Sequence, residues 1–211
     1  TNFPLFFSRN QQDGSWVLSA LSSFESMQNL FVDEGRWNAI YQPTSLQTFP
    51  FYLMQSPKVE NSYTIGILES SEAFSKESGE EIFDSAGRAS QYLSKAKSLL
   101  EASIKQDIET YRFMQEAEAL GLIKAIDLQL VFEDNNTQNI AGLCTIDEDK
   151  LQSLTPEKMT RLNDSGYLIA IHAMLLSIYQ LNLLLRKHNE RNTENKITQL
   201  KIEVAKDRVA S

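Results

Sequence analysis

Short runs of alternating apolar and polar residues, separated by turn residues, occupy the first third of the chain. Two such runs, residues 4–8 and 15–21, flank the turn sequence at 10–14, which contains Asn10 and ends in a glycine. This arrangement predicts a β-hairpin, because the alternation is that of half-buried strands and the glycine permits a tight turn. Residues 63–68 show the pattern again and predict a further strand.

Between these strands lies a stretch, residues 31–52, that is rich in Phe, Trp and Tyr and holds a turn signal at 33–35. Prolines interrupt this stretch and the residues just after it, so a long helix is excluded there. We expect a packed, irregular aromatic layer. Residues 69–84 are acidic with interspersed Ser and Gly, a composition that predicts an exposed loop.

The pattern then changes to helical spacing, beginning at Ser90, a residue suited to cap a helix, and running to Gly121, a residue suited to end one. This predicts one long helix that lies across the sheet with one face buried. The residues of its predicted face are Leu93, Ala96, Leu100, Ile104, Asp107, Tyr111, Met114 and Glu118.

Alternation returns in residues 126–133 and 139–146, which predict a second hairpin around a polar turn. A short helix follows, with Thr155 as its cap and Pro156 in its first turn, and it ends near Gly166. These elements predict an α+β fold: an antiparallel sheet of short strands packed with a long central helix and a long C-terminal helix.

We expect residues 1–186 to form a single domain of this class. The last helix begins near Tyr167, and residues 197, 200 and 204 continue an apolar helical stripe beyond it. The segment 187–211 is therefore predicted to be a basic amphipathic tail, helical or frayed. It could pack on the acidic body, pair with another copy or remain in solvent.

Composition excludes several classes of function but adds little to the prediction of the fold. The 211 residues carry a net charge of −8, which argues against nonspecific nucleic-acid binding, since phosphate neutralisation requires clustered positive charge. One cysteine, Cys144, excludes internal disulfides and multi-cysteine metal sites. Polar residues interrupt the apolar run 167–185, so we expect a buried helix and no transmembrane segment. No glycine-rich phosphate loop or paired histidines occur, and we expect no cofactor and no metal.

One candidate site for acid–base chemistry combines His172 with Asp147 and Glu148. A helix histidine and carboxylates at the end of a strand can converge in an α+β fold, which would make the chain an enzyme acting on a peptide or small molecule. The alternatives are structural: His172 lies among apolar residues and suits the core, and Asp147 suits a helix cap. We favour a protein that is not an enzyme.

A second candidate site contains Arg36, Trp37 and Tyr41, which follow a tight turn. Exposed Trp, Tyr and Arg residues are enriched where proteins bind one another, so these three could form a binding surface for a protein or peptide. The alternative is that the aromatic rings belong to the core.

Nine residues, N-L-F-V-D-E-G-R-W at 29–37, open a series of segments that resembles the SapC family of bacterial proteins. The resemblance covers residues 3–186 in the family's order and approximate spacing. The further matching segments are Tyr41-Gln42-Pro43, Phe49-Pro50-Phe51, residues 82–87, Tyr92-Leu93, Gly121-Leu122, residues 141–143, Ile146-Asp147-Glu148 with Leu151, and residues 172–178.

This resemblance implies no reaction, cofactor or catalytic residue. It implies an accessory, noncatalytic role linked to surface layers or outer-membrane receptors, with a protein or peptide as partner. A structural subunit of such a layer and a homo-oligomer through the C-terminal helix are further alternatives. We expect a cytoplasmic location, with the cell surface or envelope as the alternative.

Overall fold

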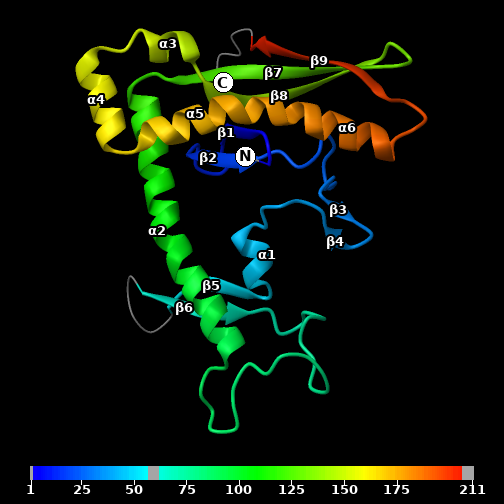
Figure 1. The fold of residues 1–211 in the computed structure, drawn as a ribbon, viewed down its shortest axis with the longest axis vertical. Coiled ribbons are helices and arrows are strands. Elements are labelled where there is room, and N and C mark those ends of the chain that lie inside the picture. Colours follow the sequence, from blue (N-terminus) through cyan, green and yellow to red (C-terminus); the bar gives the residue numbers. More distant parts are fainter. Residues whose placement is uncertain (1, 57–61, 206–211) are drawn as a thin grey trace. The chain divides into compact units, whose positions relative to one another are not determined.

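The computed structural model describes residues 2–56 and 62–205 (Figure 1). The chain forms two compact units. Unit 1 comprises Thr1–Ile40 and Thr110–Ser211, and unit 2 comprises Tyr41–Glu109. Unit 2 is thus inserted in the sequence of unit 1, and both units contain residues of the expected domain 1–186. The class is α+β, as predicted.

An antiparallel sheet of five strands organises unit 1 within the described residues, in the order β2-β1-β8-β7-β9. Both predicted hairpins are confirmed, because β1 pairs with β2 and β7 pairs with β8. Strand β1 also pairs antiparallel with β8, where Phe7 lies opposite Cys144, and this pairing joins the two hairpins. The strands are β1 (Leu5–Arg9), β2 (Trp16–Ala20), β7 (Ile123–Phe132), β8 (Thr137–Ile146) and β9 (Ile197–Val204).

One face of this sheet is buried, and an almost unbroken helical run crosses it: α5 (Tyr167–Ser177), the 3-10 turn η1 (Ile178–Gln180) and α6 (Leu181–Arg191) (Figure 1). Alternate residues of β7 point to the helices, so Leu128 is fully buried against the cluster that holds Leu184. Each such leucine contributes about 2 kcal/mol by leaving water.

A second cluster lies at the other end of the same unit. It brings the last turns of α2 (Gln91–Ala119) together with β1, α5 and the short helix α4 (Pro156–Asp164). Helix α3 (Glu148–Gln152) precedes α4 and adds Leu151. The fully or nearly buried members are Phe7, Phe113, Met114, Ala117, Leu122, Ile146, Leu151, Leu162, Ile171 and Met174.

Unit 2 has a smaller framework. It contains α1 (Thr44–Thr48), the hairpin of β5 (Phe51–Gln55) and β6 (Tyr63–Ile67), and the first turns of α2. Its buried hydrophobic cluster comprises Phe51, Leu93, Ala96 and Leu100. The acidic segment 69–84 has no helix or strand and is largely exposed, as its composition predicts.

Helix α2 confirms the predicted boundaries and corrects the predicted face. Ser90 Oγ accepts a hydrogen bond of 3.2 Å from the Leu93 N–H, which is the expected cap. The helix is buried only near its two ends, and residues 105–109 are exposed. The predicted face members Asp107, Tyr111 and Glu118 are therefore exposed, while Phe113 and Ala117 are buried instead.

The prediction of a helical tail is wrong for Ile197–Val204. Helix α6 ends at Arg191, and the chain returns as β9, which pairs antiparallel with β7. Leu130 of β7 lies opposite Leu200, and Leu128 lies opposite Ile202. The free edge of β7 supplies backbone hydrogen-bond partners, and this long-range pairing outweighs the local helical spacing. Residues 206–211 of the predicted tail lie outside the described residues.

Candidate functional site

A two-residue hairpin presents Arg36 and Trp37. Strand β3 (Val32–Asp33) pairs with β4 (Arg36–Trp37), and the turn residues Glu34 and Gly35 have φ angles of 47° and 75°. Two positive φ angles define the turn type that suits the twist of a tight hairpin. The predicted turn is confirmed, and it leaves Arg36 exposed to solvent.

Arg191, at the end of α6, holds the segment that leads into this hairpin. Its guanidinium donates hydrogen bonds to the carbonyl oxygens of Asn29, at 3.1 Å, Leu30, at 3.3 Å, and Val32. An ion pair of 3.9 Å to Asp33 adds to this attachment. Sequence reasoning missed Arg191, because these carbonyls lie about 160 residues away along the chain and carry no sequence signal.

Trp37 takes part in the core and also lines a surface hollow. Its ring lies 6.0 Å from that of Phe3 and 6.2 Å from that of Phe31, and the side chain is half-buried. The core alternative for this residue is therefore realised in part, and its role in binding stays a prediction. The hollow has a volume of about 460 Å³ and lies wholly within unit 1; we call it the Trp37 hollow. Its lining residues are Asn2, Phe31, Trp37, Asn38, Ala39, Ile40, Leu183, Arg186 and Lys187.

The Trp37 hollow combines apolar walls with positive charge. Ile40 is 98 % exposed at its rim. Lys187 Nζ lies 5.2 Å from the centroid of the Phe31 ring, within the range of a cation–π contact. Arg186 is exposed and pairs with Glu190 at 3.6 Å. A surface of this composition suits a ligand that carries both an apolar group and a carboxylate.

Tyr41, the third residue of the predicted binding surface, belongs to unit 2, where it is 56 % exposed. Arg36 and Trp37 belong to unit 1. The structure thus shows two of the three predicted residues on one hairpin and assigns Tyr41 to the other unit.

A family model described as SapC matches residues 1–184. The chain belongs to the SapC family. No curated protein and no solved structure matches it. The matched region includes the β3–β4 hairpin, whereas Arg186, Lys187 and Arg191 follow it in the sequence. In this SapC chain, residues beyond the matched region therefore complete the Trp37 hollow and hold its hairpin.

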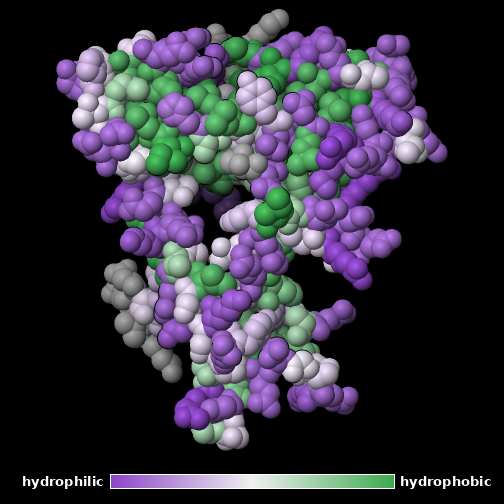
Figure 2. Space-filling model, in the orientation of Figure 1, coloured by the Kyte–Doolittle hydropathy of each residue, from purple (hydrophilic) through white to green (hydrophobic). Residues whose placement is uncertain are grey.

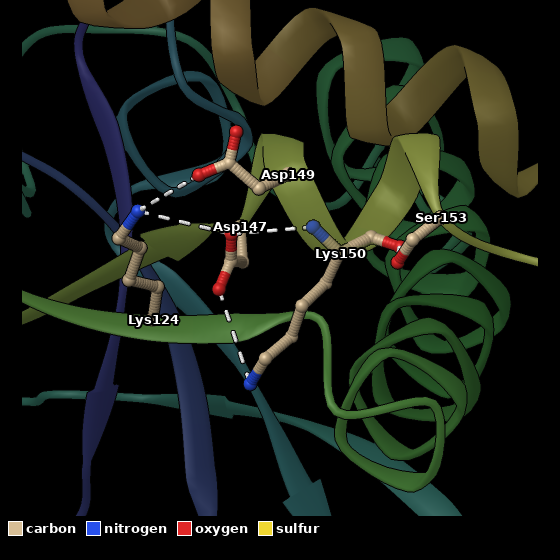
Figure 3. Close-up of polar contacts among 5 residues, drawn as sticks. All are labelled: Lys124, Asp147, Asp149, Lys150 and Ser153. Carbon is tan, nitrogen blue, oxygen red and sulfur yellow. Dashed lines mark hydrogen bonds and ion pairs between the residues drawn. The ribbon is translucent and has the colours of Figure 1, made fainter.

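Asp147 of the alternative site is a buried helix cap in this SapC chain (Figure 3). Its carboxylate accepts a hydrogen bond of 3.4 Å from the Lys150 N–H at the start of α3. The same carboxylate forms ion pairs with Lys124 at 3.7 Å and with Lys150 Nζ at 3.9 Å. Lys124 also lies 4.0 Å from Asp149, and Glu148 is exposed beside this network. These contacts describe a structural cap, one of the alternatives that the sequence left open.

His172 is exposed on α5, and the expectation of a buried core histidine is wrong. Its Nδ1 lies 2.7 Å from the carbonyl oxygen of Leu168, one turn earlier in the same helix. Among the described residues, no hydrogen bond or ion pair joins His172 to Asp147 or Glu148. The acid–base reading of these three residues stays a prediction without a contact to support it.

Within the described residues the buried histidine is His188 on α6, which sequence reasoning did not single out. It is 2 % exposed and lies edge-on to Phe24 and Phe132, at 5.9 and 6.4 Å between ring centroids. Burial lowers the pKa of His188 below its usual 6.5, and the negative charge of Glu25 opposes this shift. The amide of Asn192 lies 3.3 Å from its Nδ1.

Cys144 lies in β8 as predicted, half-buried, and burial raises the pKa of its thiol above the usual value. A thiol of this kind is mainly protonated at neutral pH and therefore a poor nucleophile. Across residues 2–56 and 62–205, no group of three or more His, Cys, Asp or Glu side chains is arranged to hold a metal ion.

Proposed function

We propose that this SapC protein is a noncatalytic, protein-binding accessory module that recognises a peptide segment of its partner through the Trp37 hollow. The observation that carries this proposal is the presence of the Trp37 and Ile40 side chains and two cations in one hollow. Aromatic and arginine side chains around a hollow are typical of the residues that dominate binding energy in protein interfaces.

The chemistry of the hollow also indicates the kind of segment that it binds. The apolar side chains favour an aliphatic or aromatic side chain of the partner, because its burial removes apolar surface from water. Arg186 and Lys187 favour a carboxylate, either an acidic side chain or a C-terminus. The proposed ligand is therefore an acidic peptide with an apolar anchor. The family resemblance supports a partner in a surface-layer or outer-membrane receptor system.

Affinity capture from lysate and envelope fractions of the source cells tests this function. We expect the wild type to retain a partner that Ile40→Asp and Lys187→Glu lose at least about tenfold, a change of about 1.4 kcal/mol in binding. Ile40 is 98 % exposed, so its variant leaves the Phe3–Phe31–Trp37 packing in place, whereas the Lys187 variant removes the cation that lies over the Phe31 ring.

Met27→Glu is the matched control, because Met27 is fully exposed and does not line the hollow. A partner that is retained equally by all four proteins would contradict the proposed site. If only the wild type and the control recover a partner, short peptides that cover the partner's sequence should be tested as competitors. We expect peptides that are acidic and carry an apolar side chain to displace the partner from the wild type.

A further inference from the structure

The outward face of α5 and η1 carries a stripe of apolar residues that does not contact the sheet. Ile169 is 79 % exposed, Leu176 is 63 % exposed and Tyr179 is 70 % exposed, and the exposed His172 lies between the first two. We call these four residues the outer stripe. Figure 2 shows hydrophobic side chains at the surface over α5. The opposite face of the helix is the one that is buried, through residues such as Ile171, Met174 and Leu181.

Composition makes this exposure unusual. Residues 167–185 contain no Asp, Glu, Lys or Arg, although an exposed helix face normally carries charged side chains. By length and composition, Tyr167–Arg191 is also the one helix in the described parts of the chain that could cross a membrane. A helix that is apolar on both faces must bury the second face as well, or leave it in water at a cost.

The spacing of the outer stripe indicates what covers it. Its members follow one another at intervals of three, four and three residues, which is the spacing of the contact positions in a coiled coil. Such a stripe presents a straight seam to another helix, whose side chains fit between its own. The seam is therefore shaped for a helix.

The charges at the two ends of the outer stripe indicate which helix packs against it. Asp164 precedes α5, and Arg186 and Lys187 follow the stripe. If two copies pair antiparallel, Ile169 of each lies against Tyr179 of the other, and His172 lies against Leu176. The Arg186 end of each copy then lies near the Asp164 end of the other, whereas a parallel pair would bring like charges together.

We propose that the outer stripe is the interface of an antiparallel homodimer of this chain. The proposal shares Arg186 and Lys187 with the Trp37 hollow, but the stripe residues Ile169 and Leu176 do not line that hollow, so their variants test the dimer separately. It relocates the pairing expected for the C-terminal helix to a defined face of α5. A bilayer is the weaker candidate, because a spanning helix would have to leave the sheet that its inner face covers.

Sedimentation equilibrium of the full chain in 0.15 M salt, where charge repulsion between copies is screened beyond about 8 Å, tests the dimer. We expect a dimer at about 100 µM wild type and a dissociation constant raised at least about 100-fold in Leu176→Glu and Ile169→Glu. Met27→Glu should dimerise as the wild type does. A monomeric wild type, or variants with unchanged mass, would overturn the proposal.

Disulfide trapping tests the direction of the pair. In a Cys144→Ser background, Ile169→Cys and Tyr179→Cys proteins are prepared separately, mixed and oxidised. An antiparallel pair predicts a disulfide between an Ile169→Cys copy and a Tyr179→Cys copy. Disulfides between two Ile169→Cys copies, or between two Tyr179→Cys copies, would show a parallel pair and overturn the proposal.

Flotation with neutral phosphatidylcholine vesicles tests the other occupant. A wild type that stays with the aqueous fraction while forming dimers supports the proposal. A monomeric wild type that floats with the vesicles, and loses this binding in Leu176→Glu, would replace it with a membrane surface.

Discussion

Unit 1 and unit 2 bury their strands in different ways. The sheet of unit 1 has five strands and carries a helical run across one face, and two clusters of buried side chains lie within the unit. Unit 2 has a two-stranded hairpin whose buried side chains, with those of the first turns of α2, form one small cluster. A two-stranded hairpin is marginal in water without a helix to pack on, so unit 2 depends on α2.

This difference indicates where the chain opens most easily. Much of unit 2 is the exposed loop that includes residues 69–84, whereas the strands β7 and β8 of unit 1 are paired over most of their length. Regions with few buried contacts unfold locally at a lower free energy than a well-packed core. We expect the amide hydrogens of β5 and β6 to exchange faster than those of β7 and β8.

The largest expected effect on stability comes from truncating one core leucine of each unit to alanine. Leu128→Ala in unit 1 should lower the free energy of unfolding by about 4 kcal/mol, because the residue is fully buried. Leu100→Ala in unit 2 should cost about 2 kcal/mol. Hydrogen exchange measured peptide by peptide should place the second effect in β5, β6 and the start of α2. Equal acceleration in both units would show that they unfold as one body.

A smaller effect is expected at the cap of α3. Asp147→Ala should lower the stability of unit 1 by about 1 kcal/mol in urea unfolding, because the Lys150 N–H loses its partner and Lys124 loses an ion pair. Glu148→Ala is the control, since that side chain is exposed. A loss as large in Glu148→Ala would contradict the assignment of Asp147 as the cap.

The smallest expected effect is on how the free energy of unfolding varies with pH. The folded state holds the pKa of His188 below the unfolded value of about 6.5, so the unfolded state binds more protons and stability falls as the pH drops below 6.5. His188→Gln should flatten this part of the curve. Urea unfolding at pH 7.5 and at pH 5.0 measures the free energy of unfolding of both proteins. If the wild type and His188→Gln lose the same free energy between the two pH values, His188 is not the cause.

Local signals predicted much of the fold because they depend on neighbouring residues. The turn at Glu34-Gly35, the cap at Ser90 and the first-turn Pro156 each act within a few residues, and all three occupy the expected places. The candidate site was predicted less completely. Residue type singled out Trp37, which lines the hollow, and Arg36, which lies beside it on the hairpin but does not line the hollow. Arg186, Lys187 and Arg191 reach the site only through the packing of α6.

The two histidines illustrate the same limit. His172 and His188 lie sixteen residues apart on one helical run, which places them about 160° apart around its axis. Both are surrounded in sequence by apolar residues, and the sequence does not show which side of such a helix meets the sheet. The structure puts His188 against Phe24 and Phe132 and leaves His172 in solvent.

By itself, the sequence determined the α+β class, the two hairpins of the main sheet, the bounds of α2 and membership of the SapC family, because alternation, caps and motif order are properties of short segments. Only the tertiary structure decided that Ile197–Val204 is a strand and that Arg191 holds the β3–β4 hairpin. Both depend on partners distant in sequence: the open edge of β7 and three backbone carbonyls. Hydrogen-bonding groups of this kind occur in every residue, and folding alone selects which of them meet.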